Sequence, residues 1–221
     1  MVTLHKKLNL KEILKLEVEN HHVLKNPWLL AKHNKLTKDD LLLWLSQEYF
    51  VSVDFVNWFL LTAAKTNDIE SKIILVENIW EELGEGKSEE SHVSILVSFL
   101  KEIGFNFDKH KILDHTKQYL TKMKEVLDLG FFESLGALGP ANEYLLKLEY
   151  GMMFESYNKL SEELSLPNAK FFKVNLNADE GHSAKLFQLI EDKADSPEKK
   201  EKVILGNKLA LDARMIFYKG L

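Results

Sequence analysis

The sequence predicts an all-α protein, a single bundle of seven or more helices over residues 1–221. Capped amphipathic segments follow one another along the chain, and such segments indicate helices. Strand-like alternation of apolar and polar residues is scarce, and the chain has only four prolines. No linker, repeat or low-complexity run divides it. Helices joined by short connections are typical of one all-α domain, and a chain of this length can bury one large core.

Caps and breakers mark the elements of the N-terminal half. The predicted elements are, in order, a helix from Leu10 to Val23, a short segment from Pro27 to Lys35, a helix from its cap Thr37 to about Thr66, and a helix from Ile69 to about Leu83. Asp68 is the N-cap of the last of these helices, which ends at Gly84-Glu85-Gly86.

The C-terminal half continues in the same way. The predicted helices run from the cap Ser88 to Ile103, from Lys109 to about Leu129, from Leu135 to Leu164, from Pro167 to about Lys193, and from the cap Ser196 to Tyr218. Gly104 ends the first of them, and Pro197 stands in the first turn of the last, where proline is tolerated. Pro140 indicates a kink or a start within the long apolar helix that ends at Leu164.

The composition excludes several classes of function. The net charge is −5 and no basic patch stands out, so nothing favours nucleic-acid binding. The absence of cysteine excludes disulfides, thiol catalysis and thiolate metal sites, and it suits a reducing compartment. The N-terminus lacks a signal-peptide core, and the most apolar run, Tyr49 to Ala64, is short for a membrane span and contains Asp54. We therefore expect a cytoplasmic protein that binds neither nucleic acid nor a membrane.

The segment from Asn175 to His182 carries the strongest chemical signal. Asp179 and His182 stand three residues apart in a predicted helix, with Asn175 one turn earlier. Residues three and four apart share a helix face, so an amide, a carboxylate and an imidazole point the same way. Helical bundles present ligands to iron or manganese in this manner. The alternative is a polar surface face, but the helix also carries many apolar residues.

Two earlier segments offer further ligands. Glu81 and Glu82 stand near the end of one predicted helix, and His92 lies in the first turns of the next. The glycine loop between them lets the two helices pack antiparallel, which brings a carboxylate near an imidazole. Taken alone, solvated glutamates and a surface histidine are the commoner arrangement for such residues. The second apolar region holds Glu143 and Glu149, and a carboxylate among apolar side chains needs a partner or water.

The order and spacing of these residues resemble the heme-oxygenase-like diiron oxidases and oxygenases. These include relatives of the chlamydial protein associating with death domains, within the TenA and PqqC-like superfamily. The resemblance extends to the N-terminal half, over His22-Val23-Leu24, over Lys35 to Leu41, and over Trp44 to Phe55. It implies a heme-oxygenase-like bundle and six metal-ligand positions. These positions fall on Glu82, His92, Glu143, Asn175, Asp179 and His182.

The resemblance also resolves two choices and shows two departures. It prefers Glu82 to Glu81, and Glu143 to Glu149. Asn175 stands where the family has histidine, and its carbonyl oxygen is a weaker iron ligand than imidazole. The chlamydial protein resembles an enzyme that consumes its own tyrosine, but Leu29 occupies the matching position here, so that activity is not carried over.

The resemblance implies an iron-dependent oxidase or oxygenase with one or two Fe(II) ions, or manganese. Dioxygen and a small organic substrate are expected, the substrate being an amino acid, a fatty acid or an aromatic amine. An external reductant and a homodimer are further expectations from the resemblance. The alternative is a non-catalytic or metal-free TenA/PqqC-like binding protein with a degenerate metal site, which Asn175 favours. The thiaminase-type branch relies on a cysteine nucleophile, which this chain lacks.

Overall fold

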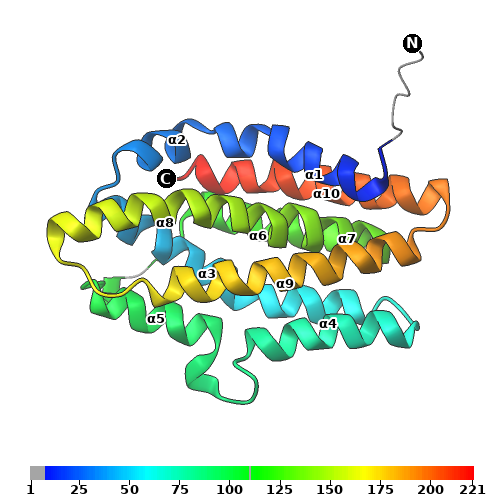
Figure 1. The fold of residues 1–221 in the computed structure, drawn as a ribbon, viewed down its shortest axis with the longest axis horizontal. Coiled ribbons are helices and arrows are strands. Elements are labelled where there is room, and N and C mark those ends of the chain that lie inside the picture. Colours follow the sequence, from blue (N-terminus) through cyan, green and yellow to red (C-terminus); the bar gives the residue numbers. More distant parts are fainter. Residues whose placement is uncertain (1–7, 110) are drawn as a thin grey trace, which may run out of the picture.

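The computed structural model describes residues 8–109 and 111–221, without the side chains of residues 109 and 178–180. Helices account for every regular element in these ranges, which confirms the all-α prediction (Figure 1). The α-helices are α1 (Leu10–Asn20), α2 (Pro27–Asn34), α3 (Lys38–Ala63), α4 (Ile69–Glu82), α5 (His92–Glu102), α6 (Asp114–Leu129), α7 (Phe131–Leu138), α8 (Leu145–Leu164), α9 (Lys170–Lys193) and α10 (Pro197–Tyr218). Within the described ranges, no helix is both long enough and apolar enough to cross a bilayer.

Several predicted helix starts were wrong by a few residues. The helix α5 begins after Ser91, whose hydroxyl oxygen accepts from the amide of Ser94, and not after Ser88. Ser88 instead opens a short 3₁₀ turn, η2 (Ser88–Glu90). Likewise α6 begins at Asp114 and α9 at Lys170, later than predicted. At α5 two serines compete for the cap, whereas α6 and α9 begin after Leu113 and Ala169, which make no side-chain cap that the sequence could reveal.

The predicted long helix from Leu135 is interrupted where its glycine and proline stand. A π-helical turn, η4 (Gly139–Tyr144), joins α7 directly to α8. Pro140 has no amide hydrogen, so it cannot donate a backbone hydrogen bond to the preceding turn. The side-chain amide of Asn142 donates to the carbonyl of Ala137 over 2.6 Å. A π-turn rotates the residues after it relative to a regular helix, and this one carries Glu143 at its inner side.

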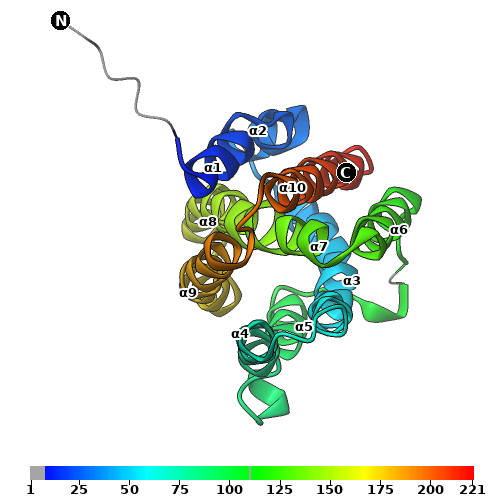
Figure 2. The same cartoon turned by 90° about the vertical axis from the view of Figure 1, so that its right-hand side faces the viewer.

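Two glycines allow α7 to lie in the middle of the bundle, against α10 (Figure 2). A Cβ added at Gly136 would come within 2.0 Å of the Val203 carbonyl oxygen, and one at Gly206 within 1.9 Å of the Glu133 carbonyl oxygen. Any side chain at either position would therefore force the two backbones apart. The close approach fixes α7, and through η4 it fixes the position of Glu143.

A buried cluster of charged side chains joins α3, α8 and α10 in the core. Arg214 of α10 donates to Glu149 of α8 over 2.7 and 3.0 Å and to Glu48 of α3 over 2.5 Å. All three side chains are at most 1% exposed. The carboxylate of Glu149 is therefore paired with the guanidinium group of Arg214. The aromatic residues Trp44, Phe55, Trp58 and Phe59 are buried and meet other rings edge to face, as core residues do.

Candidate metal centre

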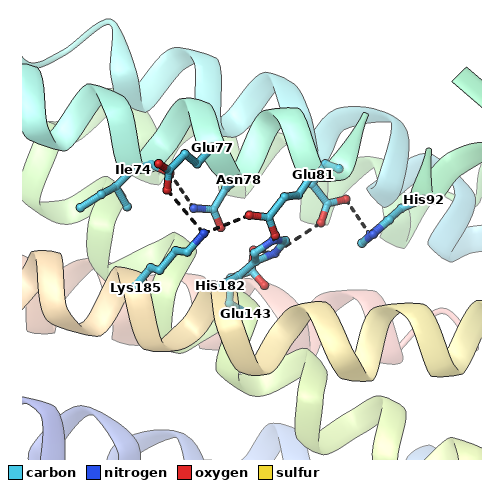
Figure 3. A network of polar contacts seen from close by, with 9 residues as sticks. Ile74, Glu77, Asn78, Glu81, His92, Glu143, His182 and Lys185 are labelled. Atoms are coloured by element: carbon cyan, nitrogen blue, oxygen red, sulfur yellow. Dashed lines mark hydrogen bonds and ion pairs between the residues drawn. The ribbon is translucent and has the colours of Figure 1, made fainter. Parts of the chain in front are cut away.

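Three ionisable side chains from three separate elements meet inside the bundle. Glu82 comes from the last turn of α4. Glu143 comes from η4 and His182 from α9 (Figure 3). One ligand atom of each lies within 4.8 Å of the others. The Nδ1 atom of His182 lies 3.7 Å from Glu82 Oε1 and 3.6 Å from Glu143 Oε1. These separations suit ligands around a shared cation better than direct hydrogen bonds.

His92 extends the cluster from the first turn of α5. Its Nδ1 atom lies 3.0 Å from Glu82 Oε2, although the two groups are not aligned as a hydrogen bond. Gly84 makes this meeting possible, since its φ is +78° and a Cβ there would collide with the backbone of Lys87 and Ser91. The glycine loop thus folds the start of α5 back beside the end of α4, as its sequence predicts.

Several ligand atoms of the cluster make no hydrogen bond to any other described residue. Glu143 and His182 are 0% exposed, and His92 is 7% exposed. Both carboxylate oxygens of Glu143 and the Nδ1 atoms of His92 and His182 make no hydrogen bond. Buried polar atoms are nearly always paired, and leaving a carboxylate unpaired in the core is costly. Two carboxylates and two imidazoles form a donor set that suits Fe(II) or Mn(II), so these residues fit a metal ion.

The pKa values of the cluster respond to burial and to mutual charge. Burial raises the pKa of Glu143, and His182 opposes the rise. Burial alone lowers the pKa of His182, but the carboxylates of Glu143, Glu82 and Glu81 outweigh it and raise the pKa to about 9. The pKa of His92 is also raised, because Glu82 outweighs the opposing effect of burial. Without a cation the imidazoles themselves carry the positive charge that the carboxylates require.

Glu81 belongs to the site, although the prediction preferred Glu82 over it. The Nε2 atom of His182 lies 2.7 Å from Glu81 Oε2, and Lys185 donates to Glu81 Oε1 over 3.0 Å (Figure 3). The same lysine lies 3.4 Å from Glu77, one turn earlier on α4. Because Glu81 holds Nε2, the other ring nitrogen of His182 faces Glu82 and Glu143. A histidine that binds a metal commonly donates its other ring N–H to a carboxylate, which fixes the orientation of the ring, and Glu81 is placed to do this for His182.

The sequence also offered Asn175, Asp179 and Glu149 as candidate ligands. Asn175 is 9% exposed, and its side-chain amide donates to the carbonyl of Phe171 over 2.8 Å. The backbone of α9 therefore holds the amide nitrogen, and the role of the amide oxygen as a weak ligand stays a prediction. The side chain of Asp179 lies outside the described residues. Glu149, the alternative to Glu143, is paired with Arg214 and stands apart from the cluster.

We expect Glu81 to control the iron affinity of the site without being a ligand. In Glu81→Ala, His182 loses the partner that fixes its ring, and iron binding should weaken by about 10- to 100-fold. Anaerobic titration with Fe(II), followed by iron analysis, measures the change. The control Glu77→Ala removes a carboxylate one turn away that contacts Lys185 and no histidine. Equal affinity in the two variants would contradict a supporting role for Glu81.

The fold and the buried cluster define an all-α bundle with a candidate metal centre. The family model described as iron-containing redox enzyme, of heme-oxygenase type, matches residues 42–215. The chain therefore belongs to this heme-oxygenase-like family of iron-containing redox enzymes. The match runs from α3 to α10 and includes every residue of the cluster.

Individual relatives are similar to this chain over most of its length. A protein of Nitrosomonas europaea called 4-aminobenzoate synthase is 22% identical over 218 residues, which cover 92% of this chain and 87% of that protein. A CADD-like protein of unknown function from Nostoc punctiforme has the same fold, with a TM-score of 0.76 at 20% identity over 95% of this chain and 94% of that one. A TenA homologue from Pyrococcus furiosus gives 0.68 at 17% identity, over 96% and 100%. The predicted heme-oxygenase-like fold is confirmed.

Proposed function

We propose that the protein is an iron-dependent oxidase or oxygenase that uses dioxygen on a small organic substrate. One observation carries the proposal: both carboxylate oxygens of Glu143 and the Nδ1 atoms of His182 and His92 are buried together and make no hydrogen bond to any other described residue. Membership in a family of iron-containing redox enzymes supports iron over other metals. Carboxylate and imidazole ligands suit Fe(II), and iron held by these residues would supply the redox chemistry.

The residues of this chain prepare the site in three ways. Glu82, Glu143 and His182 would hold the metal from three elements, α4, η4 and α9, and α9 packs against both of the others. Glu81, held by Lys185, orients the imidazole of His182. The rings of Tyr150, Phe171 and Phe172 pack on one another around α8 and α9 and help to exclude water from the core. A dry interior strengthens the electrostatic contacts between the ligands.

The substrate class remains an amino acid, a fatty acid or an aromatic amine. The name of the Nitrosomonas relative, 4-aminobenzoate synthase, favours chemistry that involves an aromatic amine. Leu29 argues against the reaction in which the protein consumes its own tyrosine, because a buried leucine stands at the matching position. We therefore propose an external substrate.

The alternative is a binding protein with a degenerate metal site. The side-chain amide of Asn175 supports it, because its nitrogen donates to the backbone of its own helix.

The iron content of Asn175 variants tests the proposal. We expect the unaltered protein to hold one firm Fe(II) per chain and a second weakly or not at all, because an amide offers at most a carbonyl oxygen. Asn175→His should raise the content toward two, since imidazole is a stronger ligand. Iron analysis after anaerobic loading gives the stoichiometry. The control Asn177→His adds an exposed histidine to the same helix and should leave the content unchanged.

Two results would contradict this view of the site. Two equally tight ions in the unaltered protein would show that Asn175 does not weaken the second position. Absence of both iron and manganese from all variants after loading would favour the non-catalytic alternative.

A further inference from the structure

The outer face of α4 carries a continuous apolar stripe that nothing in the described part of the chain covers. Five large side chains on it are between 47% and 74% exposed: Ile69, Ile73, Val76, Trp80 and Leu83. The buried residues of α4 lie on its opposite face, against α3 and α9. Figures 1 and 2 show α4 at the edge of the bundle, with its outer side turned away from the other helices. Exposed apolar surface of this extent marks an interaction site.

The spacing of the stripe is that of a coiled-coil seam. The five residues follow one another at intervals of four, three, four and three, which is the alternation of positions a and d in a heptad. A shallow hollow of about 400 Å³ lies along the same face, lined by Ile69, Val76, Trp80 and their neighbours. A second helix with the same spacing can place its side chains into such hollows.

The charges beside the seam are complementary to a second copy of the same helix. With the stripe at positions a and d, Lys72 takes position g on one flank and Glu77 takes position e on the other. Two parallel copies bring Lys72 of each beside Glu77 of the other, which makes two equivalent ion pairs. Antiparallel copies would bring like charges together. Glu77 is half exposed and lies 3.4 Å from Lys185, and its carboxylate can accept from a second lysine as well.

We propose that the protein forms a homodimer through parallel pairing of α4 with α4 of a second copy. The seam is self-complementary, as an interface around a two-fold axis requires. Each copy covers the apolar stripe of the other, with the ion pairs of Lys72 and Glu77 at the two flanks.

Molar mass in solution tests the proposal. Sedimentation equilibrium of the full chain should give twice 25.6 kDa at micromolar concentration. Val76→Glu puts a charge at the centre of each seam and should weaken the dimer by about 100-fold or more. The matched control, Leu205→Glu, replaces a leucine on α10 that is 44% exposed, and should leave the mass unchanged. Circular dichroism checks that each variant is folded.

Charge reversal tests the parallel pairing. Lys72→Glu and Glu77→Lys should each weaken the dimer by about 2- to 10-fold, and the double variant should restore it. Failure of the double variant to restore the dimer would overturn the parallel arrangement. A dimer that Val76→Glu leaves intact would place the interface elsewhere. A monomer in the unaltered protein would mean that some other protein covers the stripe, and would overturn the proposal.

Discussion

Replacing His182 by alanine is expected to remove most of the bound iron. Among the described histidines, only His182 has an Nδ1 atom within 3.7 Å of both Glu82 and Glu143, and it is fully buried. Alanine offers no ligand atom in its place. His182→Ala should lower the affinity for iron by more than the loss of about 10- to 100-fold that is typical when a residue supporting a ligand is removed. Anaerobic Fe(II) titration of the variant and the unaltered protein measures the difference.

The matched control is His22→Ala, which removes an exposed imidazole outside the cluster. It should bind iron as the unaltered protein does. If His182→Ala retained the same iron content and affinity as that control, the metal would have to lie elsewhere, and the cluster would be an ion-pair network only. Circular dichroism separates a lost ligand from a lost fold.

The fold could be predicted from the sequence because its signals are local. The caps Thr37, Asp68 and Ser196 each accept a hydrogen bond from the first turn of the helix they were predicted to start. The missed boundaries arose where several candidates compete, as between Ser88 and Ser91. The sequence predicted a kink or a start at Pro140, and the structure has η4 there, but its π-helical form was not predicted.

The candidate site was less predictable, because its pairings join residues far apart in the chain. Glu81 and Glu82 are adjacent at a helix end, and only the position of α9 decides that the first supports His182 from outside while the second faces the interior. Similarly, Glu149 lies among the same kind of apolar residues as Glu143. Its partner Arg214 is 65 residues away and carries no motif. Such pairs become visible only once helices are packed.

The largest expected loss of stability follows from that arginine. Arg214→Met leaves the carboxylates of Glu48 and Glu149 buried without a positive charge. Breaking a buried ion pair by removing one partner costs about 3–5 kcal/mol. The free energy of unfolding, measured by urea denaturation, should fall by this amount. The control Lys202→Met removes an exposed pair with Glu198 on the same helix and should cost at most about 1 kcal/mol.

Two further measurements separate lost charge from lost packing. Burial raises the pKa of Glu48, and Arg214 opposes the rise. In Arg214→Met that opposition is gone, so Glu48 should take up a proton in the folded state well above its unfolded pKa. The stability deficit should then shrink as the pH is lowered through the raised pKa of Glu48, because a protonated carboxyl needs no counter-charge. Adding Glu48→Met and Glu149→Met should recover most of the lost stability. A deficit that persists through both changes would mean that the packing of the Arg214 side chain against neighbouring rings such as Tyr119 of α6, and not its charge, accounts for the loss.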